Sequence, residues 1–291
     1  MLTVLQTALE VGLIYGLVAL ALFISFSILN IADLSTDGCF TLGCAVGAML
    51  TIAGHPILAL FAAMAAGMLS GYVTAFLQTR LGVESILAGI ISNTGLYTIN
   101  LAVMGFSSNV SITGVDTVFS LFKGLVGGQW SRLILLALIA AVVVIVLIRF
   151  FGTSLGLSIR ATGDSLDMVS ASSINPKATI TIGLCLANAL TALSGCLIGE
   201  YNKFCDINLG TGMVTIALAS LIIGEVFTGH RGGVGKRIVC VVLGSIVYRF
   251  IIALALRLNI SAEYFKLVSA VIVAVAIAAP NMKGYVRLAK I

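Results

Sequence analysis

The chain has 291 residues, of which 60% are hydrophobic and only 9% are charged, and its mean hydropathy is +1.17. A soluble domain carries about 25% charged residues, so this composition excludes a soluble protein. Unbroken apolar runs such as residues 133–148 exclude the alternating segments of a membrane β-barrel. The net charge of +5 comes from basic residues scattered at helix ends, which is no signal for nucleic acid. We predict an all-α, polytopic membrane protein that forms one transmembrane domain over residues 1–291.

Apolar segments of about the length that spans a bilayer occur along the whole chain. We expect about nine, at residues 6–29, 35–53, 57–78, 84–104, 130–150, 178–200, 211–228, 238–257 and 264–280. An odd number places the termini on opposite sides of the membrane. If the polar interval 152–177 is cytoplasmic, basic residues concentrate on that side, which predicts the N-terminus outside and the C-terminus inside a cell membrane.

The second segment opens with polar residues where a continuous helix is expected. Residues 30–38 hold two carboxylates, several other polar side chains and a glycine. Such groups are expensive to bury in a membrane unless they line a cavity, so we predict a broken or re-entrant helix here. The alternative is an interfacial loop with its aspartates in water. Residues 206–212 have a similar pattern, and the two stretches are candidates for the halves of an inverted repeat.

A solute path is therefore expected beside this second segment and the middle of the fourth one. Asn93, Asn100 and Asn188 are mid-span amides, whose usual role is hydrogen bonding between helices. We select Asn93 as the one that faces a pore. The predicted path residues are Asn30, Asp33, Ser35, Thr36, Asp37, Gly38 and Asn93.

The polar interval 152–177 is much longer than the usual connection between helices. We predict a loop up to Gly163, then a short helix that begins at Asp164 as its N-cap and ends near residue 173. Pro176 suits the first turn of the following helix. The interval therefore has its own structure, unless it is only an exposed loop whose charges enforce topology.

The sequence holds no catalytic or metal-ligand set. His55 and His230 are the only histidines, the cysteines have no metal-ligand spacing, and no serine lies in a nucleophile elbow. We expect neither an enzyme nor a metal site. Glu225 and Arg249 are the ionisable residues most clearly inside predicted spans, and we interpret Glu225 as structurally paired and Arg249 as in need of a partner or a wet cavity.

Three motifs resemble one family in the order in which that family carries them. The stretch 156–164, GLSIRATGD, with Ile174-Asn175 after it, resembles the cytoplasmic coupling loop of ABC importer permeases of the branched-chain-amino-acid and ribose type. Those permeases have R-A-x-G-x-N/D followed by G-I-N, and here Ser173 replaces the last glycine. Residues 221–235 resemble their L-G-G … G-G-x-G segment with Glu225 in place of a glycine, and residues 33–35 resemble their D-L-S.

The resemblance implies a transmembrane subunit that needs partners. It implies a second permease chain, in a homodimer or heterodimer, an ABC ATPase subunit on the cytoplasmic side, and an extracellular or periplasmic solute-binding protein. The chain would hold no cofactor, ATP being bound by the ATPase, and would move a small polar solute, an amino acid above all. The residues implied for ATPase coupling are Gly156, Arg160, Ala161, Gly163, Asp164, Ile174 and Asn175. The alternative function is a secondary transporter or channel that needs no ATPase.

Overall fold

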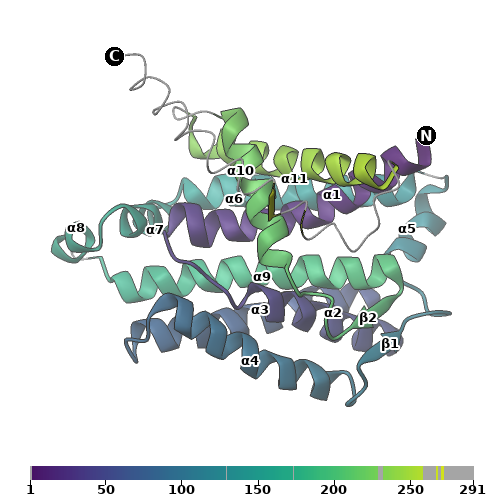
Figure 1. Ribbon diagram of the computed structural model, residues 1–291, viewed down its shortest axis with the longest axis horizontal. Coiled ribbons are helices and arrows are strands. Elements are labelled where there is room, and N and C mark those ends of the chain that lie inside the picture. The colour runs from purple at the N-terminus through teal and green to yellow at the C-terminus, as the bar shows by residue number, and fades with distance from the viewer. Residues whose placement is uncertain are drawn as a thin grey trace.

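The computed structural model describes residues 2–128, 130–172, 174–228 and 232–257, and residues 267, 270 and 271 besides. Among these residues six helices are long and apolar enough to cross a membrane. They lie side by side along the molecule (Figure 1). They are α1 (Leu2–Leu22) with its π-helical continuation η1 (Phe23–Ile28), α3 (Pro56–Thr79), α4 (Ser85–Val103), α6 (Ser131–Phe151), α9 (Pro176–Asn202) and α11 (Val234–Arg257). The predicted all-α polytopic class is confirmed.

Two further apolar helices are shorter than a full span. They are α2 (Thr36–Ile52) and α10 (Met213–Thr228), and they correspond to the predicted segments 35–53 and 211–228. Almost all of the last predicted segment, 264–280, lies outside the described residues. Both short helices follow polar stretches of irregular backbone, residues 29–35 before α2 and residues 207–212 before α10.

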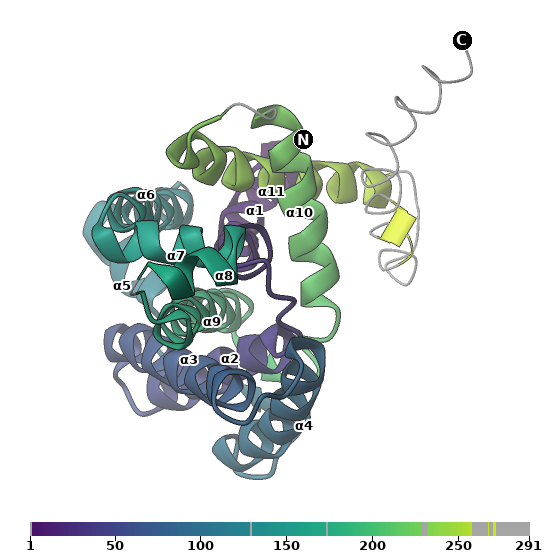
Figure 2. The same ribbon diagram turned by 90° about the vertical axis from the view of Figure 1, so that its left-hand side faces the viewer.

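Helix α9 occupies the centre of the bundle, as the view along the helices shows (Figure 2). It contacts α1, α2, α3 and α7, among others. Glycines allow this crowding, since side chains on Gly43 and Gly67 would overlap the backbone of α9, and one on Gly195 would overlap that of α2. Small residues at such crossings bring helix backbones together, which is how apolar helices gain packing energy inside a membrane.

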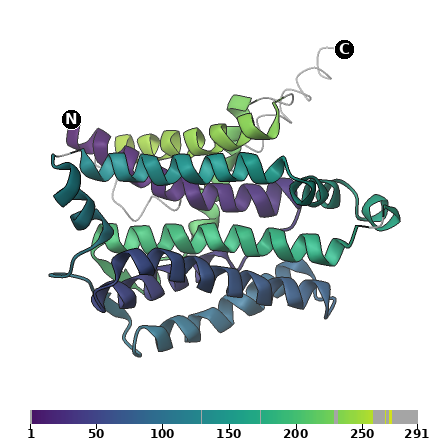
Figure 3. The same cartoon turned by 180° about the vertical axis from the view of Figure 1, so that it is seen from behind.

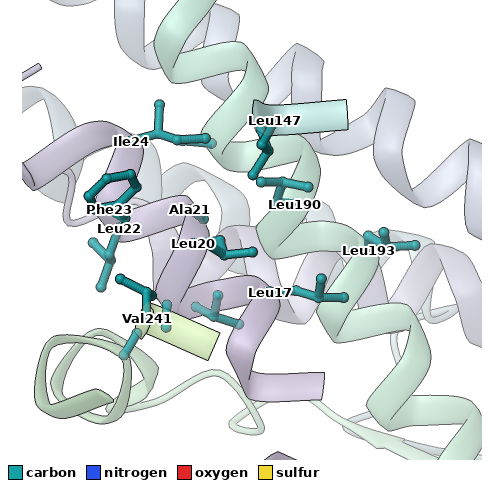
Figure 4. Packing of buried hydrophobic residues seen from close by; sticks show 14 of the residues in the cluster. Leu17, Leu20, Ala21, Leu22, Phe23, Ile24, Leu147, Leu190, Leu193 and Val241 are labelled. Atoms are coloured by element: carbon teal, nitrogen blue, oxygen red, sulfur yellow. The ribbon is translucent and has the colours of Figure 1, made fainter. Parts of the chain in front are cut away.

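The main core lies where α9 meets α1, α6 and α11. Leu17 and Leu20 of α1 lie close to Leu190 and Leu193 of α9, as Figure 4 shows, and Leu147 of α6 closes the same cluster. These side chains are almost completely buried. The first span, α1, is therefore buried inside the bundle. Its packing fixes the place from which the irregular segment before α2 begins.

Irregular backbone separates α1 from α2, in the region where the sequence predicted a broken or re-entrant helix. Helix α1 widens into η1, and irregular backbone runs from residue 29 to residue 35 before α2 begins. Asn30 adopts a left-handed conformation with φ of 56°, which asparagine tolerates better than most residues. Isolated π-helical turns of this kind are frequent at functional sites.

Short elements close the two ends of the bundle (Figure 3). At one end lie α7 (Ser154–Asp164) and α8 (Leu166–Ala171). At the other lie α5 (Val118–Val126) and a two-stranded antiparallel sheet, in which β1 (Asn109–Ser111) pairs with β2 (Phe204–Asp206) with Val110 opposite Cys205. The connection between α4 and α6 thus has structure of its own.

The predicted details of the interval 152–177 are partly wrong. A helix, α7, stands where a loop was expected, and Asp164 is its last residue instead of an N-cap. The cap of α8 is Ser165, whose hydroxyl accepts a hydrogen bond from the Met168 N–H at 3.3 Å. Pro176 does occupy the first turn of α9, as predicted, and Asn175 caps that helix.

Candidate functional site

The first turn of α2 is bonded to the beginning of α10. The Asp37 carboxylate accepts the Gly212 N–H on Oδ2 at 2.9 Å and the Val214 N–H on Oδ1 at 3.0 Å. The Thr41 hydroxyl accepts the Gly210 N–H at 3.1 Å. A carboxylate at a helix N-terminus satisfies free N–H groups and complements the helix dipole. The two interrupted regions predicted from sequence therefore meet, and Asp37 joins them.

Beside this junction is a polar pocket of about 330 Å³. It lies between α2, α4 and the segment that leads from β2 to α10. Three of the predicted path residues line it, namely Asp37, Gly38 and Asn93. The other lining residues are Thr41, Thr94, Tyr97, Asn100, Ile207, Asn208 and Thr211. We call this the polar pocket below.

Helix α4 contributes a polar stripe to the pocket. Asn93, Tyr97 and Asn100 follow one another at spacings of four and three residues, which places them on one face of the helix. Asn100 is buried and donates from Nδ2 to the Gly38 carbonyl at 3.0 Å. Sequence reasoning named the two asparagines singly and missed Tyr97, although the spacing of residues 93, 97 and 100 places all three on one helix face.

Other predicted path residues lie in a buried network and not in the polar pocket. The Asp33 carboxylate, only 2% exposed, accepts the Ser35 N–H at 2.9 Å, the Ser35 hydroxyl at 2.6 Å, and Nδ2 of Asn188 at 2.8 Å. Thr36 is also buried and donates to the Asp33 carbonyl. Asn30 is exposed at the break in the chain. In this conformation the network stabilises the start of α2.

The residues of the predicted coupling set gather at the α7–α8 end. Side chains at Gly156 and Gly163 would overlap backbone, of α6 in the first case and of Ile28 in the second. Arg160 and Asp164 are exposed, and neither forms an ion pair with a described residue. Of the remaining members, Ala161 is half-buried on α7, while the half-buried Ile174 and the exposed Asn175 lie in the connection from α8 to α9.

Helix α7 is also bonded to the central helix. The Thr162 and Thr179 hydroxyls, from α7 and α9, lie 2.8 Å apart. Thr162 is buried, so this hydrogen bond is shielded from water. Helix α7 therefore packs on η1, α6 and α9, and its opposite face is exposed.

Glu225 is paired near the same end of the bundle. Its Oε1 accepts from Nη2 of Arg237 at 2.7 Å and from the Ser27 hydroxyl at 2.6 Å. The guanidinium of Arg237 also lies 5.1 Å from the ring centroid of Phe23. This trio, Ser27–Glu225–Arg237, connects η1 to the α10–α11 hairpin and agrees with the structural interpretation of Glu225.

Arg249 has an aromatic partner. Its guanidinium carbon lies 3.9 Å from the ring centroid of Tyr15, a distance at which a cation is attracted to the ring face. It also lines a second pocket of about 330 Å³ between α1 and α11. The predicted need for a partner or a cavity is met by both.

Two buried carboxylates escaped sequence reasoning. Glu10 accepts from Gln6 Nε2 and from the Tyr201 hydroxyl, each at 2.9 Å. Glu200 accepts the Val118 N–H at 2.8 Å and the Thr51 hydroxyl at 3.1 Å. Both glutamates lie near the ends of predicted spans, where a charged residue is normally expected to be exposed to water. No group of three or more potential metal ligands occurs in the described part of the chain.

Comparison with known proteins identifies the family. Residues 4–277 match the family model described as "Branched-chain amino acid transport system / permease component". A protein of Clostridioides difficile named "Tyrosine transport system permease protein" is 32% identical over 93% of this chain and 89% of its own length. An uncharacterized protein of Rickettsia prowazekii is 31% identical over 92% of this chain and 95% of its own length. No solved structure matches the chain.

The match agrees with the multi-pass helical fold and with the motifs from which the resemblance was drawn. Both relatives are covered over nearly their whole length, so the similarity is not confined to one helix or motif. The family name describes a transport permease and not an enzyme. The chain belongs to the permease component family of branched-chain amino acid transport systems.

Proposed function

We propose that the chain is the transmembrane subunit of a binding-protein-dependent ABC importer that moves an amino acid across the cell membrane. The family match and the name of the tyrosine transport relative support this substrate class. ATP hydrolysis takes place on a separate ATPase, and a solute-binding protein delivers the amino acid. Two permease chains form the membrane part.

The observation that carries this proposal is the packing of α7 on η1, α6 and α9. The helix exposes Arg160 and Asp164 at the end of the bundle, while Gly163 on the same helix touches the backbone of η1. From there the chain runs through the break at residues 29–35 to the Asp33 network and the polar pocket. A partner that pushes on α7 acts on this connection without any contact with the solute.

The roles of the coupling residues follow from their positions. Arg160 offers five fixed donors for carboxylate or carbonyl groups of the ATPase. Gly163 permits the close approach to Ile28, and Asp164 adds an acceptor at the exposed end of α7. We place this end in the cytoplasm, so the end with β1, β2 and α5 faces the binding protein.

Two substitutions test the coupling. Arg160→Ala and Gly163→Val are expected to leave membrane insertion and docking of the binding protein normal, but to abolish ATPase association or solute-stimulated ATP hydrolysis. The measurement is co-purification with the ATPase encoded nearest to the gene, followed by transport in proteoliposomes. Wild-type transport and co-purification in both variants would reject the coupling role.

The solute path is tested by cysteine accessibility in a cysteine-free background. Asn93→Cys is expected to react with small aqueous thiol reagents, because Asn93 lines the polar pocket. Ser35→Cys and Thr36→Cys, at buried positions, are expected to react only in a nucleotide state that opens the break. If all three resist the reagents in every nucleotide state, the path runs elsewhere.

The alternative, an ATPase-independent secondary transporter or channel, makes the opposite prediction for the isolated chain. Purified permease in liposomes without ATPase should not move an amino acid down an ion gradient. Such movement would favour the alternative and end the importer proposal.

A further inference from the structure

The polar pocket carries one formal charge, and that charge is negative. Eight of its ten lining residues have a polar side chain, and Asp37 is the only Asp, Glu, Lys or Arg among the ten. No Lys or Arg is among the described residues that line it. A cleft lined by charge of one sign concentrates ions of the opposite sign, so the pocket favours cationic groups.

Asp37 retains acceptor capacity on the pocket side. Each of its oxygens accepts one backbone N–H from the start of α10. An ionised carboxylate has about four lone-pair sites, so about two stay free for a donor in the pocket. The hydrogen bonds to Gly212 and Val214 also hold the carboxylate in place.

Two amide oxygens add to this set of acceptors. Nδ2 of Asn100 donates to the Gly38 carbonyl, and because a carbonyl can only accept, the orientation of the amide is determined. Its Oδ1 is buried and has no partner among the described residues, which is a costly state for a polar atom. The Asn93 Oδ1 faces Gly38 so closely that a β-carbon there would lie 2.6 Å from it.

We propose that the polar pocket is a subsite for the ammonium group of a zwitterionic solute. An ammonium group has three donors and no acceptor, which matches the acceptors of Asp37, Asn93 and Asn100 around Gly38. The half-exposed ring of Tyr97 lies in the same wall and can attract a cation through its face. The inference rests on the proposed function, since it places this subsite on the solute path.

The first test measures the electrostatic preference of the pocket without any solute. Asn93→Cys is introduced into a cysteine-free permease in nanodiscs. It is then labelled with 2-aminoethyl methanethiosulfonate, a cation, and with 2-sulfonatoethyl methanethiosulfonate, an anion. The ratio of the two rates, relative to that of 2-mercaptoethanol, is expected to favour the cation about tenfold. Asp37→Asn should remove most of this preference.

A second variant guards against a folding defect in Asp37→Asn. Asn208 is exposed and lines the pocket, so Asn208→Lys adds a positive charge to the wall and should also lower the cation preference. Asp116→Asn removes an exposed carboxylate away from the pocket and should leave the ratio unchanged. A ratio equal to that of 2-mercaptoethanol, or one that neither Asp37→Asn nor Asn208→Lys lowers, would overturn the proposal.

The second test compares two probes that share a phenol ring and differ in the group at the other end. Tyramine carries the ammonium group alone, and 3-(4-hydroxyphenyl)propionate carries the carboxylate alone. Tyramine is expected to slow the labelling of Thr211→Cys, an exposed lining position outside the three proposed acceptors, more than the acid does. Equal or reversed protection would overturn the subsite.

Failure of the subsite and failure of the importer proposal are distinguishable. Both labelling experiments use the isolated permease without ATP or ATPase. Absence of a cation preference in the cysteine-free Asn93→Cys permease would leave the ATPase co-purification result untouched. Transport without an ATPase would reject the importer proposal and leave the labelling rates as they are.

Discussion

Gly163 of α7 lies directly against the backbone carbonyl of Ile28, the last residue of η1. Two residues later the chain turns at Asn30, and it then reaches the buried carboxylate of Asp33. A helix with an exposed polar face therefore rests on the short irregular segment that leads to the start of α2. Backbone-to-backbone contact of this kind leaves no flexible side chain to absorb a displacement.

Replacing Gly163 should disturb this contact. In Gly163→Ala the new methyl group overlaps the Ile28 carbonyl, and overpacking of this type costs about 1–3 kcal/mol. The gain in helix propensity, about 1 kcal/mol, offsets only part of the loss. Thermal unfolding of the purified permease measures the effect. Gly152→Ala is the matched control, because its methyl group has ordinary contacts with the nearest atom at 3.4 Å. Equal stability of the two variants would contradict a close contact between Gly163 and the Ile28 carbonyl.

The pair Glu225–Arg237 should show a measurable but modest coupling. Their side chains are 36% and 31% exposed, so solvent screening limits the pair to about 1 kcal/mol. A double-mutant cycle with Glu225→Gln and Arg237→Gln measures this coupling energy in thermal unfolding. The same cycle with Lys236→Gln in place of Arg237→Gln should give a value near zero, since Glu225 forms its ion pair with Arg237. Two equal coupling energies would show that the coupling comes from the overall charge of the protein and not from the Glu225–Arg237 contact.

The partners Asp33 and Asn188 should be exchangeable but not individually replaceable. Asn188→Asp removes the donor at 2.8 Å and places two carboxylates together in a buried site. We expect a loss of about 1.5–3 kcal/mol, the range for hydrogen bonds to charged groups. The double variant Asp33→Asn with Asn188→Asp restores one acceptor and one donor and should recover part of the loss. Without such recovery in thermal unfolding, the hydrogen bond is not what holds the segment.

Glu200 should hold α5 against the bundle. Glu200→Ala leaves the Val118 N–H without its acceptor at the beginning of α5, at a cost of about 1–3 kcal/mol. Amide hydrogen exchange in residues 118–126 is then expected to be faster than in the wild type. Thr51→Val removes the other hydrogen bond of Glu200 and leaves the Val118 contact, so its effect should be smaller. Unchanged exchange in Glu200→Ala would mean that α5 is held by its apolar contacts alone.

The prediction at Asp164 shows where local reasoning fails. A glycine followed by an aspartate is typical of a helix start, because glycine lowers helix propensity and aspartate caps well. Here Gly163 lies inside α7, since the helix must approach the Ile28 carbonyl more closely than any side chain would allow. The N-cap of the next helix, α8, is consequently Ser165 and not Asp164. The tertiary contact outweighs the propensity.

Sequence by itself determined the membrane class, the positions of the long helices and the break before α2. Apolar runs of span length and polar residues at a span boundary are local signals, since a bilayer tolerates few arrangements of backbone and charge. The family motifs are local as well. All of these could be read without knowing which helices touch.

Only the tertiary structure decided the pairings of the polar groups. Asp37 and Gly212 are 175 residues apart, and Asp33 and Asn188 are 155 residues apart, yet each pair is joined by a hydrogen bond. No local pattern encodes such partners, because they depend on where α2 and α9 cross and where α10 begins. The polar pocket arises in the same way, from side chains of three separate segments that packing brings to one place.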